Sequence, residues 1–148
     1  MIKKYLIIVL FSLTALTGCL KFGNDEETNT PTTDQVARCK SEMYLNSSAT
    51  VIPLGYKLLG SGIDDAIWFK FKIQCTDISE IFDTKIVDIT KFKHGFNFFH
   101  DMKNLEWWDV SGKDLIGGQV SLPNARCMNV GLLKIEDGYI VYIMWHET

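Results

Sequence analysis

The sequence has few of the residues that mark several protein classes. It contains 3 prolines and 11 glycines in 148 residues, which excludes a collagen-like or low-complexity chain. Four cysteines are too few for a disulfide-dense scaffold, and no apolar run reaches the ~20 residues that a membrane-spanning helix needs. Positive charge is also scarce: 15 Lys and Arg stand against 18 Asp and Glu, and this net charge of −3 argues against a nucleic-acid partner. The 47% hydrophobic content instead indicates one globular domain.

The N-terminal residues have the layout of a processing signal. Lys3 and Lys4 precede a 12-residue apolar stretch, residues 5–16, which is too short to span a membrane. The stretch ends in Leu16-Thr17-Gly18-Cys19, which closely resembles the lipobox of bacterial lipoproteins. The resemblance covers residues 1–19 and implies cleavage before Cys19, with lipid attached to the Cys19 thiol. An ordinary secretory signal with a coincidental cysteine is the alternative.

The same resemblance implies a place in the cell. Leu20, rather than Asp, follows the cysteine, which implies the outer membrane, facing the periplasm. We expect residues 1–18 to be the signal peptide and residues 19–33 a lipidated flexible tether, because residues 21–33 are polar and acidic with no hydrophobic period. A recognition segment that orders on binding is the alternative for the tether. Cleavage would leave 13 basic and 18 acidic residues, an acidic domain.

Residues 34–148 are expected to form a single α+β domain, an antiparallel sheet of about five strands with one or two short helices packed against it. Apolar spacing predicts a helix over 34–45 with Thr33 or Asp34 as its N-cap, and the capping-box spacing of Asp77 and Glu80 predicts a second short helix. Residues 51–56 are expected to be irregular and extended. The predicted strands are 66–74, 105–110, 115–122, 127–135 and 139–146, of which the last is apolar on both faces and therefore central.

Three cysteines remain beyond the lipidated one: Cys39, Cys75 and Cys127. In an oxidising compartment one pair can form a disulfide and leave one thiol over, and the alternative is three buried free thiols. The sequence does not choose among the three pairings. Their spacings of 36 and 52 residues give no zinc cluster, so we expect no metal and no cofactor besides the lipid on Cys19.

The residues of this sequence that could take part in catalysis form no complete catalytic motif. Gly60-Ser61-Gly62 is a fragment of a phosphate-binding loop and is interpreted as a turn. His94 and His100, with Asp101, have a spacing that matches no common metal-ligand pair, and His146 is interpreted as a surface residue at a strand end. Asp64 and Asp65 are either an acid/base pair or caps of local backbone amides. We therefore expect no catalytic residue and no enzyme.

Aromatic residues beside lysines give the better candidate for a binding surface. Trp68, Lys70 and Lys72 alternate with the apolar core positions of one predicted strand, so their face is either solvent-exposed or covered by a second layer. Trp107 and Trp108 are adjacent, and in a strand they would point to opposite faces. The candidate binding face is the set Trp68, Lys70, Lys72, Trp107 and Trp108.

The missing catalytic constellation, the tether and this face together predict a small protein-binding module, and the lipobox resemblance implies that it is lipid-anchored and faces the periplasm. Its partner, which the sequence does not identify, would be a component of an envelope complex, or the protein would have an immunity or exclusion role. A glycan or cell-wall binder, or a weak cell-wall enzyme that uses Asp64 or Asp65, is the alternative. A third interpretation is a passive assembly factor.

Overall fold

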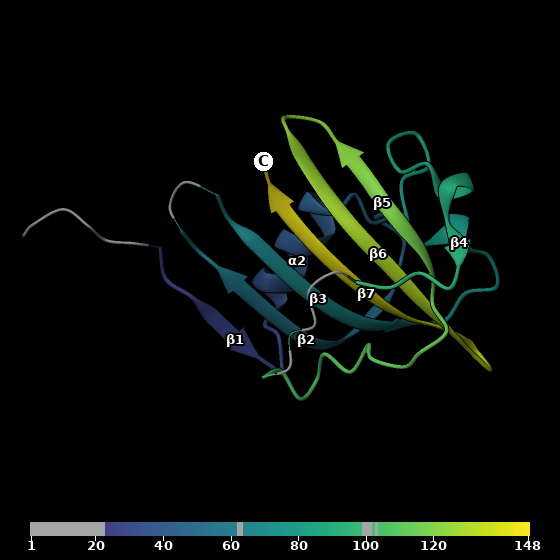
Figure 1. Ribbon diagram of the computed structural model, residues 1–148, viewed down its shortest axis with the longest axis horizontal. Helices are drawn as coiled ribbons and strands as arrows, with labels where there is room; N and C mark the ends of the chain where they lie inside the picture. The colour runs from purple at the N-terminus through teal and green to yellow at the C-terminus, as the bar shows by residue number, and fades with distance from the viewer. Residues whose placement is uncertain (1–22, 62–63, 99–101, 103) are drawn as a thin grey trace, which may run out of the picture.

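The computed structural model describes residues 23–61, 64–98, 102 and 104–148. Over these residues, seven strands form one antiparallel sheet in the order β1-β2-β3-β7-β6-β5-β4 (Figure 1). The strands are β1 (Glu26–Thr28), β2 (Val51–Leu59), β3 (Ala66–Ile73), β4 (Lys93–His94), β5 (Ile116–Leu122), β6 (Arg126–Ile135) and β7 (Gly138–Glu147). One α-helix, α2 (Thr33–Glu42), and two 3-10 turns, η1 (Ile78–Glu80) and η2 (Ile89–Lys91), complete the described elements. The fold is therefore sheet-rich, with seven strands rather than about five.

Four of the five strands predicted from the sequence are present in the structure. The predicted strands at 66–74, 115–122, 127–135 and 139–146 correspond to β3, β5, β6 and β7. β7 lies between β3 and β6, and side chains on both of its faces are buried, as expected from its two apolar faces. The segment expected to be irregular, 51–56, belongs to β2, which carries a register shift between Pro53 and Gly55. Residues 105–110, predicted as a strand, form an irregular segment with a turn at residues 106–107 instead.

The structured part of the domain begins earlier than residue 34. Glu26–Thr28, which we expected in the flexible tether, pairs with β2 as an edge strand. Two side-chain contacts hold this strand: Lys57 Nζ lies 3.1 Å from Glu27 Oε2, and Gln35 Nε2 donates to Glu26 Oε2. The N-cap of α2 is Thr32 rather than Thr33 or Asp34, because Gln35 completes a capping box with it.

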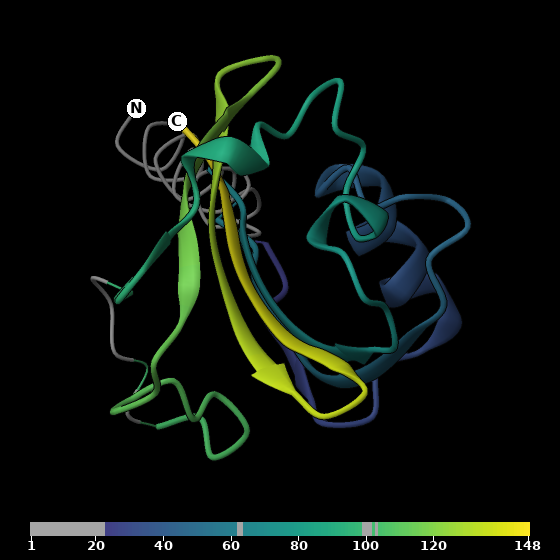
Figure 2. The ribbon, with the colours of Figure 1, turned by 90° about the vertical axis from the view of Figure 1, so that its right-hand side faces the viewer.

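Both faces of the sheet are covered (Figure 2). On one face, α2 and the segment that contains η1 and η2 bury a core whose largest members are Trp145, Tyr56, Phe69, Phe71 and Phe82. On the other face, residues 104–115, hereafter the covering segment, pack over β3 and β7 through Leu105, Trp108, Val110 and Leu115. Figure 2 shows α2 on one side of the sheet and the covering segment on the other. The covering segment determines which part of its face remains open to a ligand.

Candidate functional site

A charged cluster ties the covering segment to the sheet. Lys70 Nζ of β3 donates to Asp109 Oδ1 at 2.6 Å and to the carbonyl oxygen of Trp107 at 2.9 Å. Lys113 Nζ donates to Asp109 Oδ2 at 2.7 Å, and the buried Tyr142 hydroxyl donates to Asp109 Oδ1 at 2.9 Å. Partial burial raises the pKa of Asp109, but the hydrogen bonds from Lys113, Lys70 and Tyr142 outweigh it and hold the pKa well below its usual range.

This cluster changes the interpretation of the predicted binding face. Trp68 and Trp108 are buried at 6% and 3% exposure, because the covering segment, to which Trp108 belongs, packs against the face of the sheet that carries Trp68. Lys70 is engaged by Asp109, and Lys72 Nζ lies 3.1 Å from Asp137 Oδ2. The second of the two alternatives thus holds: a further layer covers this side of β3. Within the predicted set, Trp107 remains partly exposed and lines a groove.

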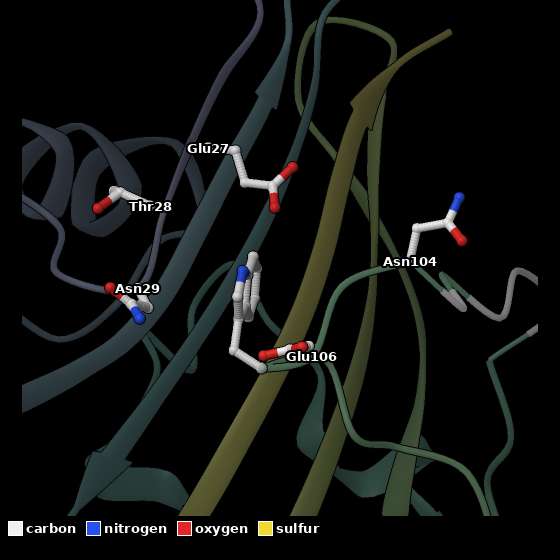
Figure 3. A pocket seen from close by; sticks show the side chains of 6 residues that line it. Glu27, Thr28, Asn29, Asn104 and Glu106 are labelled. Carbon is white, nitrogen blue, oxygen red and sulfur yellow. The ribbon is translucent and has the colours of Figure 1, made fainter.

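The groove lies between the edge strand β1 and the covering segment (Figure 3). It has a volume of about 540 Å³ and is lined by Glu27, Thr28, Asn29, Asn104, Glu106 and Trp107. Figure 3 shows Glu27 and Asn29 on the β1 side and Asn104 and Glu106 on the side of the covering segment. Segments about 80 residues apart in the sequence, roughly 27–29 and 104–107, therefore build one site.

A glycine in the neighbouring strand determines the position of Trp107. Gly55 lies in β2 at the register shift, and a Cβ atom added there would come within 2.2 Å of the Trp107 ring carbons Cδ2 and Cε3. The indole ring therefore packs directly on the backbone of β2. Its other neighbour is Trp108, whose ring meets it edge-on at 5.8 Å between centroids. Trp107 is held between the sheet and the buried Trp108.

The groove is acidic and carries hydrogen-bonding amides. Glu106 is exposed and has no ion-pair partner within the described part of the chain, whereas Glu27 is paired with Lys57. An aromatic ring beside carboxylates favours a cation, which gains cation–π attraction as well as ion pairing. β1 also ends the sheet, so its outer backbone groups face away from β2. The site is therefore suited to a positively charged, extended ligand.

Sequence reasoning missed the two carboxylates of this groove. Glu27 fell within the expected tether, and no local signal indicates that its segment would pair with β2. Glu106 fell within a predicted strand that does not form. Trp107 was identified because two adjacent tryptophans cannot both be buried on the same side of a strand, although the structure places the pair in a turn.

The aspartates, histidines and cysteines singled out from the sequence, where the structure describes them, do not line the groove. Asp65 Oδ2 lies 3.3 Å from Arg38 Nη2, and the Asp64 backbone N–H donates to the Ser61 hydroxyl, so both aspartates belong to the turn before β3. His94 is an exposed residue of β4, whereas His100 and Asp101 lie outside the described residues, as do Cys19 and Gly62. Cys39, Cys75 and Cys127 are free thiols in the structure.

Comparisons with protein-family models, with curated proteins and with solved structures find no match for this chain. Among the described residues, no helix is long and apolar enough to cross a membrane. In the same part of the chain, no three side chains of His, Cys, Asp or Glu gather closely enough to hold a metal ion.

Proposed function

We propose that this chain is a lipid-anchored, periplasm-facing bacterial lipoprotein that acts as a small protein-binding module. Two observations support the proposal. The lipobox resemblance at Leu16–Cys19 supports the anchor, and the groove that Trp107 shares with Glu27 and Glu106 supports the binding role. The groove is the observation on which the proposal depends.

The chemistry of the groove indicates what part of a partner it takes. An extended segment can lie beside β1, which is the last strand of the sheet within the described residues, and hydrogen-bond to its outer edge, which is a common mode of peptide recognition. A lysine or arginine of that segment can then lie over Trp107 with its charge near Glu106. We therefore assign the groove to a basic, extended segment of a protein partner. An envelope-complex component or an incoming toxin that the protein neutralises would both supply such a segment.

The test is a titration of the purified full-length protein in detergent. A lysine-rich peptide is compared with a glutamate-rich peptide of the same length, by calorimetry at low and high salt. We expect the lysine-rich peptide to bind and to weaken with salt, because exposed charges are screened. Glu106→Gln should weaken binding by up to about fivefold, since one exposed ion pair contributes about 0.2–1 kcal/mol.

The control is Glu136→Gln, which removes an exposed carboxylate from the β6–β7 turn, outside the groove. This variant should bind like the wild type. Equal binding of both peptides, or equal loss in both variants, would contradict a specific acidic groove.

A glycan or cell-wall ligand is a second candidate, and the two carboxamides of Asn29 and Asn104 beside Trp107 favour it. Aromatic rings with neighbouring amides provide stacking and hydrogen bonds for a sugar. Peptidoglycan fragments that bind with little salt dependence, in place of the lysine-rich peptide, would support this candidate over the protein partner.

A further inference from the structure

A second cavity lies on the face of the sheet that the covering segment packs against, over β3, β5, β6 and β7. Its volume is about 450 Å³, and its walls include the apolar side chains of Trp68, Phe98 and Met144. Its polar lining residues are Gln119, Asn129 and His146. This cavity shares no lining residue with the groove at Trp107, so the binding role proposed for the groove does not account for it.

Beside this cavity a thiol and an imidazole are in contact. Cys127 of β6 and His146 of β7 are direct cross-strand partners, and Cys127 Sγ lies 3.0 Å from Nε2 and 3.5 Å from Nδ1 of the ring. Gln119 of β5 donates from Nε2 toward the same sulfur at 3.7 Å. Two strands, β5 and β7, thus direct polar groups at one sulfur atom of the strand between them.

A second sulfur belongs to the same wall. Met144 lies two residues before His146 on β7 and therefore on the same face, and both line the cavity. A thiol, an imidazole and a thioether form a soft donor set, which selects monovalent copper over harder cations. Trp68 and Phe98 supply the apolar surroundings that limit the access of water to such a site.

We propose that Cys127, His146 and Met144 form a binding site for a monovalent copper ion. Bonds as long as those that zinc makes, about 2.3 Å to sulfur and 2.0 Å to nitrogen, place two ligand atoms roughly 3.5 Å apart, so the observed 3.0 Å contact needs a small side-chain rotation. On binding, the copper–sulfur bond replaces the S–H bond and the proton passes to solvent, while copper stays in the +1 state. Gln119 is a positioning residue that hydrogen-bonds the sulfur.

The test is a titration of the reduced full-length protein with Cu(I) in the presence of a chromogenic Cu(I) chelator, without oxygen. We expect one equivalent to bind, with an ultraviolet band from thiolate-to-copper charge transfer. Cys127→Ser should remove the band and weaken binding by at least about tenfold, because even the loss of a residue that only hydrogen-bonds a ligand typically costs that much. Cys75→Ser, a partly exposed thiol elsewhere, is the matched control and should bind like the wild type.

Met144→Leu provides a second, near-isosteric variant in case Cys127→Ser folds poorly, and it should weaken Cu(I) binding while keeping the charge-transfer band. Equal affinity in the wild type, Cys127→Ser and Met144→Leu would overturn the proposal, as would the absence of stoichiometric binding. If Zn²⁺ bound as tightly as Cu(I) and through the same residues, the assignment to a soft monovalent ion would be overturned. The outcome is independent of peptide binding at the groove.

Discussion

The indole ring of Trp107 lies directly on the backbone of Gly55, where a single added methyl group would come within 2.2 Å of the ring. This contact joins the covering segment to the second strand of the sheet. It also fixes one side of the groove that Glu106 and Glu27 both line. The position of the candidate binding residue therefore depends on the absence of a side chain at residue 55.

Gly55→Ala should displace Trp107 and weaken ligand binding at the groove. Overpacking of this kind costs about 1–3 kcal/mol of unfolding free energy, which chemical denaturation would measure. Gly118→Ala is a suitable control, because its added Cβ would meet its nearest neighbour, the Lys91 carbonyl oxygen, at an ordinary 3.4 Å. If Gly55→Ala left both stability and binding unchanged, the close contact between Gly55 and the Trp107 ring would not be what positions Trp107.

Asp109→Asn should destabilise the protein near neutral pH by about 1–2 kcal/mol, because Lys70 and Lys113 lose a charged acceptor. We expect the lower end of this range, since the Asp109 side chain is 49% exposed. Asp88→Asn, whose partner Lys91 is 73% exposed, should cost less than about 0.5 kcal/mol.

The effect of Asp109→Asn should also depend on pH. The folded-state pKa of Asp109 lies below its unfolded value of about 3.9, so its contribution is complete above that pH and is lost as the pH falls toward the folded-state pKa. Urea unfolding of both proteins between pH 7 and pH 3 measures the difference in unfolding free energy. A difference that stayed constant or grew as the pH fell would contradict the role given to this carboxylate.

The three cysteines of the domain should be reduced and unequal in reactivity. Burial raises the pKa of the Cys39 thiol to about 12, and this side chain is 0% exposed, whereas Cys75 is partly exposed. Maleimide should therefore label Cys75 first and Cys39 after unfolding. Mass spectrometry of the labelled protein measures the order, and a disulfide between any two of the three would contradict the free-thiol structure.

Replacement of the lipidated residue tests the anchor. Cys19→Ser should release the protein from the membrane fraction, because it removes the thiol that would carry the acyl chains. Fractionation followed by immunoblotting measures this. A Cys39→Ser variant should stay with the membrane, and membrane retention of Cys19→Ser would contradict the lipoprotein interpretation.

The strands were predictable where the apolar residues of a segment either alternate with polar ones or occupy both faces. Alternation identified β3, and two apolar faces identified β7 as central. The same reasoning was wrong at residues 105–110, because Leu105, Trp108 and Val110 are buried against a sheet face rather than paired in a ladder. β1 was missed because Glu-Glu-Thr has no apolar residue, and its place depends on the long-range contacts of Glu26 and Glu27.

The candidate sites differ in how far the sequence could have revealed them. In the structure the turn between β6 and β7 consists of Glu136 and Asp137, and Cys127 and His146 are equally distant from it along the two strands, so their contact could be found from the sequence once the turn is placed at those two residues. Counting back from the turn would have paired them. The groove at Trp107 has no such signal, since it joins an edge strand to a distant turn segment whose placement depends on the Lys70–Asp109 ion pair.

The most direct test of the binding role is a photo-crosslinking residue placed at position 104, on the rim of the groove, in the full-length anchored protein in cells. The crosslinked partner peptide is then sequenced by mass spectrometry, with and without added lysine-rich peptide, and position 136 serves as the control. We predict a crosslink from position 104 to a lysine- or arginine-rich segment, which the peptide competes away. An acidic or apolar crosslinked segment, or equal yields from positions 104 and 136, would contradict the account.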